Sequence, residues 1–367
     1  MDTRVIMIQG RGETLSSEEE QALQEAGEVL RRGGLVAFPT ETVYGLGGDA
    51  LNPESSRKIY AAKGRPSDNP LIVHIARMED LAAIVRQVSG EAALLARTFW
   101  PGPLTMILPK AESVPYETTG GLETVAVRMP SHPVARRLIV WGGGYVAAPS
   151  ANLSGRPSPT SAKYVLEDMN GRIDMILDGG EGDIGLESTI VDLTVSPPQI
   201  LRPGYITREM LETVLGQVGV DQTILQADSG QAPRAPGMKY RHYAPKGELT
   251  IISGPAGQVT NYINIHAAED RKQGYKVGVI GTDEALAQYR ADVVSSLGSR
   301  RDEDSIARHL YSILREFDDA QVTRIYSECF ETTGLGQAIM NRLLKAAGHK
   351  LIVLDGTVSS AGQDNRV

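Results

Sequence analysis

The chain has 367 residues, which is more than one hydrophobic core usually holds, so its length favours two folded domains. Apolar residues make up 41% and charged residues 22%, proportions that exclude a chain disordered along its whole length. The net charge is −8, and acidic residues outnumber basic ones on both sides of residue 247. Neither half is therefore a basic platform that clamps nucleic acid by its phosphates.

Targeting and redox features are few. No apolar run reaches the length of about eighteen residues that a membrane helix needs. The N-terminal hydrophobic stretch that ends at Gln9 is too short for a signal peptide, so we expect a cytoplasmic protein with no membrane segment. The single cysteine, Cys329, excludes an internal disulfide and a thiolate zinc cluster, and its apolar neighbours indicate a small core residue.

The N-terminal part predicts a helix followed by a strand. Ser17 and Glu20 have the spacing of a capping box, and apolar residues recur at helical spacing until Gly33. The short apolar run 35–38 predicts a strand, which Pro39 closes. We interpret residues 40–47 as a functional turn and loop.

Short apolar runs separated by helical stretches predict an α/β first domain. Several runs follow one another after short loops, which favours a mixed rather than a purely parallel sheet. A helix near 207–215 ends this domain. The further expected strands are 71–75, 104–108, 124–128, 145–148, 173–177, 189–193 and 199–201.

A stretch rich in Pro, Gly and polar residues predicts a linker, and we place the boundaries at 1–215, 216–247, 248–355 and 356–367 for the first domain, linker, second domain and flexible tail. The second domain reads as a smaller Rossmann-like α/β unit, although the glycines at 334 and 336 do not form a dinucleotide fingerprint. Its expected strands are 249–252, 277–280, 293–297 and 324–326, and its last helix is 335–347.

Two short motifs have polar side chains suited to phosphate. Lys63-Gly64-Arg65 follows a helical pattern, and two cations so close together can grip a polyphosphate, but they equally suit an ordinary solvated helix end. Ser150 and Asn152 directly follow a strand, where their side chains donate either to phosphate or to their own turn. Taken one at a time, these motifs leave both interpretations open.

Two further residues are ambiguous in the same way. His74 lies inside an apolar strand, a position more typical of a hydrogen-bonded core histidine than of a ligand contact. Arg128 closes another apolar strand and could be an ordinary ion-pair partner.

The combination of motifs in one order resembles the YrdC/Sua5 family of threonylcarbamoyl-AMP synthases, in its longer two-domain Sua5 form. The most specific marks are the Pro-Thr-Glu-Thr loop, Lys-x-Arg and Ser-x-Asn. Ala235 departs from the pattern, because a serine is common there. The segments that carry the resemblance are 39–46, 63–66, 69–74, 100–105, 127–130, 149–152, 187–192, 201–204 and 235–245.

The resemblance implies a fold and an activity. The fold is a YrdC-like open twisted mixed sheet with helices around a large cavity, plus the smaller Rossmann-like α/β domain. The activity is that of a nucleotidyltransferase, an L-threonylcarbamoyladenylate synthase that makes threonylcarbamoyl-AMP and pyrophosphate from L-threonine, bicarbonate and ATP. This is the first step of N6-threonylcarbamoyladenosine (t6A) modification at position 37 of tRNAs that decode ANN codons. The missing nucleophile–base signature agrees, because the reaction needs positioning and charge neutralisation rather than a covalent intermediate.

The resemblance also implies the site residues. Lys63, Arg65, Ser150 and Asn152 are the expected catalytic residues and hold the ATP phosphates. The further ATP contacts are Asn69, Thr124, Ser158, Arg202 and Tyr243. The threonine contacts are Thr42, His74, Arg128, Ala148 and Ser188, among which Arg128 suits the carboxylate. Mg2+ is expected as a cofactor with ATP, without a protein ligand.

The linker and the partners complete these expectations. Residues 216–247 would act as a lid over the cavity, with a passive tether as the alternative. The product would pass transiently to the tRNA threonylcarbamoyl transferase, with weak or no direct tRNA binding. Two other functions stay open: an RNA-binding or ribosome-assembly module, and a carbamoyl transferase that uses carbamoyl phosphate, whose expected zinc and acylphosphatase-like segments are missing.

Overall fold

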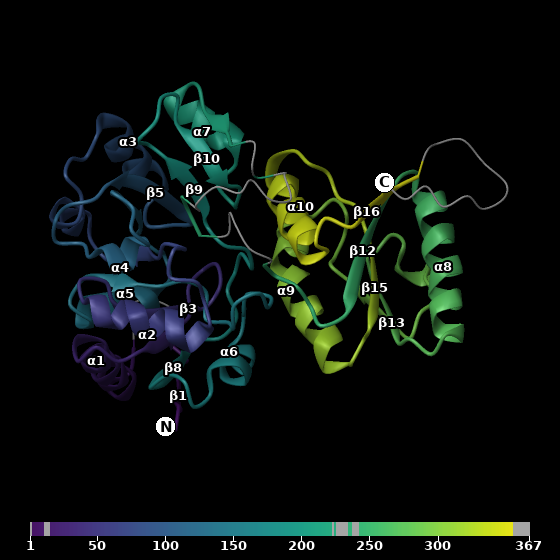
Figure 1. Cartoon of the computed structure of the whole chain (residues 1–367), viewed down its shortest axis with the longest axis horizontal. Coiled ribbons are helices and arrows are strands. Elements are labelled where there is room, and N and C mark those ends of the chain that lie inside the picture. The colour runs from purple at the N-terminus through teal and green to yellow at the C-terminus, as the bar shows by residue number, and fades with distance from the viewer. Residues whose placement is uncertain (1, 11–14, 222–223, 225–233, 237–241, 355–367) are drawn as a thin grey trace.

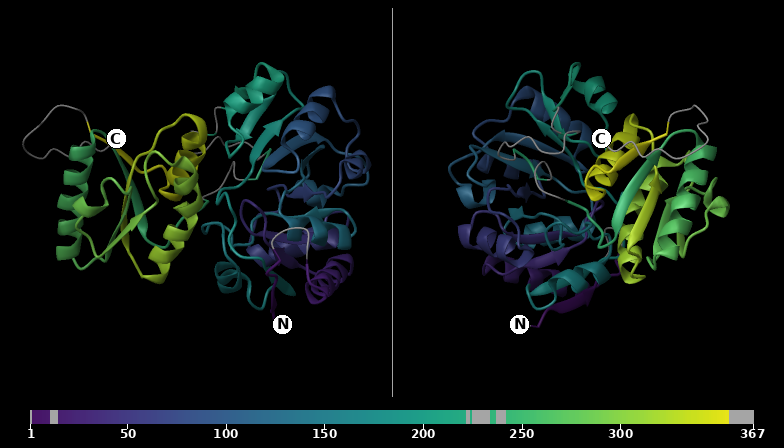
Figure 2. Two further views of the ribbon diagram at one scale, coloured as in Figure 1. Left: turned by 180° about the vertical axis from the view of Figure 1, so that it is seen from behind. Right: turned by 45° about the vertical axis from the view of Figure 1, so that its right-hand side comes forward.

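The computed structural model describes residues 2–10, 15–221, 224, 234–236 and 242–354. Two sheets organise the chain, an eleven-stranded one and a five-stranded one, and Figures 1 and 2 show them side by side with helices packed against both. The predicted tail 356–367 and half of the predicted lid, residues 222–223, 225–233 and 237–241, lie outside the described residues. Within the described ranges, no helix is long and apolar enough to cross a membrane.

The larger sheet is mixed, as the spacing of the predicted strands indicated. Its strand order is β1-β8-β2-β3-β7-β4-β6-β5-β9-β10-β11. Strands β4 and β6 run parallel, whereas β6 and β5 run antiparallel. The strands are β1 (Arg4–Met7), β2 (Val36–Phe38), β3 (Gly45–Asp49), β4 (Ile72–His74), β5 (Leu104–Pro109), β6 (Thr124–Arg128), β7 (Val146–Ala147), β8 (Met175–Asp178), β9 (Thr189–Asp192), β10 (Gln199–Arg202) and β11 (Gly219–Val220).

Helices cover this sheet and bury two apolar clusters. Leu23, Leu30 and Leu138 of helices α1 and α5 pack with Val36 and Met175 of β2 and β8 in one cluster, and the larger cluster involves α2, α3 and α7. The described helices of this part are α1 (Ser17–Arg31), α2 (Pro53–Lys63), α3 (Gly90–Phe99), α4 (Tyr116–Thr119), α5 (Pro133–Trp141), α6 (Ala162–Met169) and α7 (Arg208–Leu215), with a 3-10 turn at Met78–Ala83.

The predicted capping box was wrong by one residue. Ser16, not Ser17, caps α1: its hydroxyl accepts from the Glu19 N–H, and the Glu19 carboxylate accepts from the Ser16 N–H at 2.8 Å. The sequence has two consecutive serines and three consecutive glutamates, so the spacing rule fits two registers equally.

The predicted loop 40–47 is partly a strand. Strand β3 begins at Gly45 and pairs antiparallel with β2. Glycine is a poor strand former, which hid this element, but the packing requires it here. A Cβ on Gly47 would lie 3.0 Å from the Phe38 ring and 2.9 Å from the Val146 side chain.

Three more strands were missed because they are short and lie at sheet edges. β1 and β11 form the two edges of the larger sheet, and β11 lies inside the predicted linker. β16 (Leu351–Val353) is an edge of the smaller sheet. Edge strands bury little, so no apolar alternation marks them in the sequence.

The smaller sheet is entirely parallel, with the order β14-β13-β15-β12-β16, so the Rossmann-like prediction is confirmed. Helix α8 lies on one face, and α9 and α10 lie on the other, toward the larger sheet (Figure 1). The remaining elements are β12 (Glu248–Ser253), β13 (Val277–Gly281), β14 (Val293–Ser296), β15 (Arg324–Glu328), α8 (Ala256–Lys272), α9 (Glu303–Asp319), α10 (Gly334–Ala346) and a 3-10 turn at Leu286–Gln288. Cys329, which was expected in the core, is half-buried after β15.

Candidate functional site

A cavity lies at the strand ends of the larger sheet, and it gathers most of the residues predicted from the sequence. It holds about 610 Å³ of space, counted out to its open mouth. The predicted residues that line it are Thr42, Arg65, His74, Arg128, Ala148, Ser150, Asn152, Ser158, Ser188, Arg202 and Tyr243. Lys63, Asn69 and Thr124 are not among the lining residues.

Sheet register explains why distant segments meet here. His74 and Arg128 are register partners at the carboxyl ends of the parallel strands β4 and β6. Strand β7 is antiparallel to β4, and the Ala148 N–H donates to the Ile72 carbonyl just beyond it. The loop that carries Ser150 therefore begins beside the carbonyl of Ile72. The loop starts at the amino end of β4, but β4 is only three residues long, so this loop still lies close to His74 and Arg128 at the other end.

Arg128 is buried and only partly satisfied. Its Nη1 donates to the Thr42 hydroxyl at 3.0 Å, and its Nη2 lies 2.7 Å from a carboxylate oxygen of Glu41. The angles of the Glu41 ion pair do not suit a hydrogen bond, and Nε has no acceptor within the described part of the chain. A buried guanidinium with an unused donor is suited to receive an anion.

His74 is a neutral side chain in the wall of the cavity. Its Nδ1 lies 3.1 Å from the Ile72 carbonyl. Burial, and then the positive charge of Arg128, lower the pKa of His74 to about 3. The ring is thus uncharged across the physiological range, and it contributes shape and hydrogen bonding to the cavity rather than charge.

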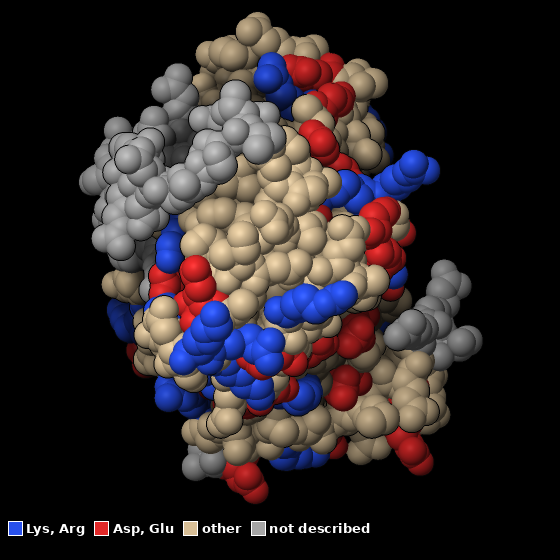
Figure 3. Space-filling model, turned by 90° about the vertical axis from the view of Figure 1, so that its right-hand side faces the viewer, with Lys and Arg blue, Asp and Glu red and all other residues tan. Residues whose placement is uncertain are grey.

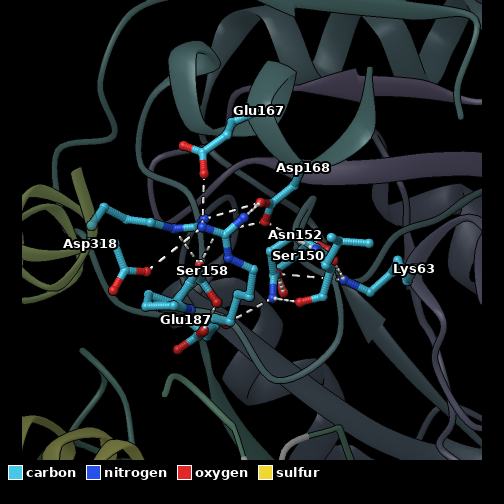
Figure 4. Close-up of polar contacts among 12 residues, drawn as sticks. Lys63, Ser150, Asn152, Ser158, Glu167, Asp168, Glu187 and Asp318 are labelled. Atoms are coloured by element: carbon cyan, nitrogen blue, oxygen red, sulfur yellow. Dashed lines mark hydrogen bonds and ion pairs between the residues drawn. The ribbon is translucent and has the colours of Figure 1, made fainter. Parts of the chain in front are cut away.

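Lys63 is buried behind the cavity at the end of α2, where Gly64 adopts a left-handed conformation with φ 59°. Its ammonium donates to the carbonyls of Ser150 and Asn152. The Ser150 hydroxyl in turn donates to the Asn152 side-chain oxygen, and Figure 4 shows the three residues together. Burial, and then Arg65, hold the pKa of Lys63 well below its usual value. In this structure Lys63 fixes the loop that carries Ser150 and Asn152.

Arg65 is half-buried at the cavity wall. Its Nε and Nη2 donate to the carbonyls of Asn69 and Pro70, at 3.3 and 3.0 Å. Burial lowers the pKa of Arg65 to about 10, so the side chain stays charged at neutral pH. Asn69 is buried, whereas Thr124 lies at the opposite end of β6 from Arg128. A strand of this length places Thr124 roughly 13 Å from Arg128.

Arg202 joins the wall to the linker. It donates to the Ser188 carbonyl at 3.0 Å and hydroxyl at 3.1 Å, and it also donates to the Pro236 carbonyl at 3.3 Å. Further along the linker, Tyr243 is buried, and its ring contacts the rings of His242 and Tyr311 in tilted arrangements, with centroids 5.5 and 5.2 Å apart. Pro236, His242 and Tyr243 of the predicted linker therefore line the cavity.

The residues at or beside the cavity that were not predicted include Arg156, Glu187 and Tyr311. Arg156 and Glu187 line it, and Tyr311 contacts Glu187 from the second domain. Arg156 and Glu187 follow or begin motifs quoted above, so proximity in sequence could have suggested them. Tyr311 lies in α9, far along the chain, and no local pattern marks it.

Glu187 is the one carboxylate among the lining residues that the structure describes, and it is fully engaged. Burial raises its pKa, but Arg342, Arg202 and the Ser158 hydroxyl together hold the pKa below its usual value. The described residues contain no group of three carboxylate, histidine or cysteine side chains placed so that it could hold a metal ion. These side chains do not fit a dedicated Mg2+ site, so we derive no step through a protein-bound metal.

Comparisons with known proteins agree with this geometry. Residues 28–204 match the Sua5_yciO_yrdC family model, described as telomere recombination, and residues 206–348 match the model of the threonylcarbamoyl-AMP synthase C-terminal domain. Threonylcarbamoyl-AMP synthases of Pyrococcus abyssi and Bacillus subtilis are 49% and 48% identical over 91% and 92% of this chain and 96% of their own lengths.

A solved structure extends the likeness to the fold. The crystal structure of P. abyssi Sua5 complexed with L-threonine superposes with a TM-score of 0.90 at 47% identity, covering 96% of this chain and all of that one. The two family models together cover both domains, and the two relatives and this structure each span both domains. The chain therefore belongs to the YrdC/Sua5 family, in its two-domain Sua5 type.

Proposed function

We propose that the chain is an L-threonylcarbamoyladenylate synthase. The main support for this proposal is the set of cations in one cavity. Arg128, whose guanidinium has unused hydrogen-bond donors, lines the same cavity as a second group of cations, Arg65 and Arg202. The first suits an amino acid carboxylate and the second suits phosphate oxygens. The relatives named threonylcarbamoyl-AMP synthase support the same assignment.

The reaction is balanced without a covalent enzyme intermediate. The threonine amine attacks the carbon of bicarbonate, and loss of water leaves a carbamate. A carbamate oxygen then attacks the α-phosphorus of ATP, the bond to the β-phosphate oxygen breaks, and pyrophosphate leaves. The protein must hold two reactants in line and neutralise charge, which its cations and hydroxyls can do.

The threonine end of the cavity would be formed by Thr42, His74, Arg128, Ala148 and Ser188. Arg128 would bind the carboxylate, and neutral His74 would bound the pocket without adding a second charge. The structure of P. abyssi Sua5 complexed with L-threonine supports threonine as a substrate of this chain too. Ser188 accepts from Arg202, so its hydroxyl hydrogen can be directed to Thr105, 2.7 Å away, or to a ligand.

The nucleotide end would be formed by Ser150, Asn152, Ser158, Arg65 and Arg202. Lys63 would act there by holding the Ser150–Asn152 loop, and Asn69, Thr124 and Tyr243 would add contacts to ATP. Mg2+ would enter as its complex with ATP, with ligands from phosphate oxygens and water. Cations beside the phosphates would stabilise the departing pyrophosphate.

The cellular setting follows from the same proposal. The product would be passed to the tRNA threonylcarbamoyl transferase in the cytoplasm, as the first step of t6A formation. Direct tRNA binding would be weak, which the net charge of −8 supports.

Figure 3 shows one face of the second domain, where Lys and Arg alternate with Asp and Glu around an uncharged area. Residues 256–268 of α8 carry no charged side chain apart from His266 when protonated. The linker would cover the cavity and shield the labile carbamate from water.

Release of pyrophosphate from ATP tests the proposal. The expected result is release that requires both threonine and bicarbonate and that stops when either is omitted. Release at the same rate without threonine would show simple ATP hydrolysis and contradict the proposal. Valine in place of threonine is the matched control, because a methyl group replaces the hydroxyl that the site is expected to recognise.

A further inference from the structure

One face of helix α9 in the second domain lies against loops of the first domain (Figures 1 and 2). Arg308, Tyr311 and Arg315 share this face because they are three and four residues apart. The Arg308 Nε donates to the Asp183 carbonyl at 2.9 Å. A Cβ on Gly185 would lie 2.5 Å from the Arg308 Cα. The two backbones are therefore so close that only a glycine fits at position 185.

Arg315 ties this face to the loop that carries Ser150, Asn152, Arg156 and Ser158, residues 150–158. It is 1% exposed. Its guanidinium donates to the Pro157 carbonyl at 2.6 and 3.1 Å and to both oxygens of Asp168 at 2.7 and 3.1 Å. Asp168 also accepts from the Leu153 N–H at 3.1 Å. Arg315 therefore holds the end of the loop directly and its middle through Asp168, while Lys63 holds its beginning.

Tyr311 supports the neighbouring wall of the cavity. Its hydroxyl lies 2.9 and 3.1 Å from the two oxygens of Glu187, and Glu187 accepts from the Ser158 hydroxyl at 2.6 Å. The Tyr311 ring also packs against Tyr243, with 5.2 Å between ring centroids. Figure 4 shows Ser158 and Glu187 next to each other, so one helix reaches both walls at the nucleotide end.

Contacts elsewhere in the same interface differ in character. Lys163 and Asp319 form an ion pair at 2.6 Å across it, with side chains 67% and 40% exposed. Such an exposed pair contributes little to the docking of the domains. The buried charge of Arg315 is costly to desolvate, and replacing both partners of such a buried ion pair by apolar side chains often stabilises a protein. The contacts of Arg315 are with residues that position the cavity loop. We therefore interpret Arg315 as a residue that sets the shape of this loop rather than one that holds the two domains together.

We propose that Arg315 and Tyr311 are positioning residues, through which helix α9 fixes the loop 150–158 and Glu187 in the geometry that binds the nucleotide. The second domain is then part of the site rather than an appendage to it. The identity of the ligand as a nucleotide rests on the proposed function. The inference that α9 holds the loop 150–158 in place is independent of that function.

Hydrogen exchange of the full-length protein tests the fixing of the loop directly. In Arg315→Met, the backbone amides of residues 150–158 are expected to exchange at least about tenfold faster. The loop opens more often because the hydrogen bonds from Arg315 no longer hold it closed. Arg315→Lys keeps the charge and is expected to restore part of the protection. Lys163→Met, which breaks the exposed ion pair, is the matched control and is expected to stay within about twofold of the parent. Unchanged exchange of the loop in folded Arg315→Met would overturn the proposal.

Binding of the two ligands measured separately distinguishes positioning from a general loss of structure. Arg315→Lys and Arg315→Met are expected to raise the Kd of a non-hydrolysable ATP analogue about tenfold and to leave the Kd of threonine within about twofold. Tyr311→Phe, which removes one hydroxyl and keeps the ring, is expected to raise the Kd of the analogue as well. An equal rise in both Kd values for Arg315→Lys would overturn the proposal. A parent that binds neither ligand would refute the proposed function, whereas the exchange measurement would still decide whether α9 fixes the loop.

Discussion

The Nη1 of Arg128 lies 3.0 Å from the hydroxyl of Thr42 and joins the end of β6 to the turn that follows β2. The two residues are 86 positions apart in sequence and are both buried. The contact leaves Nε of Arg128 without an acceptor among the described residues, at the wall of the cavity. This geometry is the basis of the threonine end of the proposed site.

Arg128→Lys is expected to raise the KM for threonine by roughly 10- to 100-fold, while the KM for ATP changes little. Lysine keeps the charge but loses the planar pair of donors that fits a carboxylate. Steady-state pyrophosphate release with each substrate varied in turn measures both constants. Arg86→Lys is the control, since Arg86 pairs with Glu123 on the surface. Equal KM values for parent and Arg128→Lys would remove the assigned role.

Lys63→Met is expected to lower product formation by about 100-fold or more in a protein that remains folded. The substitution keeps the length of the side chain but leaves the carbonyls of Ser150 and Asn152 without their donor, a loss of about 1–3 kcal/mol for each buried group. Lys58→Met on the same helix is the matched control, because Lys58 is exposed and donates to the Gly33 carbonyl at 2.7 Å, away from the cavity. Comparable losses in both variants would point to a general effect on α2.

His74 is expected to make the protein less stable in acid. Its folded pKa of about 3 lies below the ordinary value of 6.5, so the unfolded chain binds a proton that the folded chain does not. Stability from this group is present above pH 6.5 and is lost as the pH falls toward 3. Between pH 7 and pH 5 the loss is about 2 kcal/mol.

Urea unfolding at pH 7 and pH 5 measures that loss, and His74→Gln is the comparison because it cannot titrate. The parent is expected to lose about 2 kcal/mol more than the variant between the two pH values. Equal losses would show that His74 is protonated in the folded state at pH 5, contrary to its burial beside Arg128.

Much of this architecture was predictable from local patterns, and the exceptions have physical causes. Apolar runs such as 104–108 predicted buried strands, since burial on both faces leaves a continuous hydrophobic pattern. Strand β3 was hidden because its glycines are selected by contact with Phe38 rather than by strand propensity. The site residues were predicted through the family resemblance. Their local sequence patterns alone did not distinguish a functional role from a structural one.

The contribution of the second domain could not be predicted. In the sequence, Tyr311 and Arg315 are typical of an apolar and a polar position in an amphipathic helix. Their contacts with Glu187 and Asp168 become visible only in the structure of both domains together. Lys63 likewise reads as a phosphate ligand, whereas its position in the structure is behind the cavity. A sequence pattern gives the residue type at a position, but which atoms it meets depends on long-range packing.

A chain that ends at Gly247 is expected to keep a folded first domain and to lose most of its activity. The large apolar cluster of the first domain is formed within residues 35–224, so folding does not depend on α9. Glu187 and Asp168 would lose Arg342 and Arg315, and Leu186 and Tyr243 would lose their apolar partners. Circular dichroism and pyrophosphate release measure the two effects separately. Full activity in the shortened chain would show that the second domain has no part in the site.

The most direct test of the central claim is mass spectrometry of the product after incubation of the full-length protein with L-threonine, 13C-bicarbonate, ATP and Mg2+. We predict threonylcarbamoyl-AMP that carries one 13C atom and appears together with an equal amount of pyrophosphate. Formation of AMP or ADP without a labelled adenylate, when the product is trapped as fast as it forms, would contradict it.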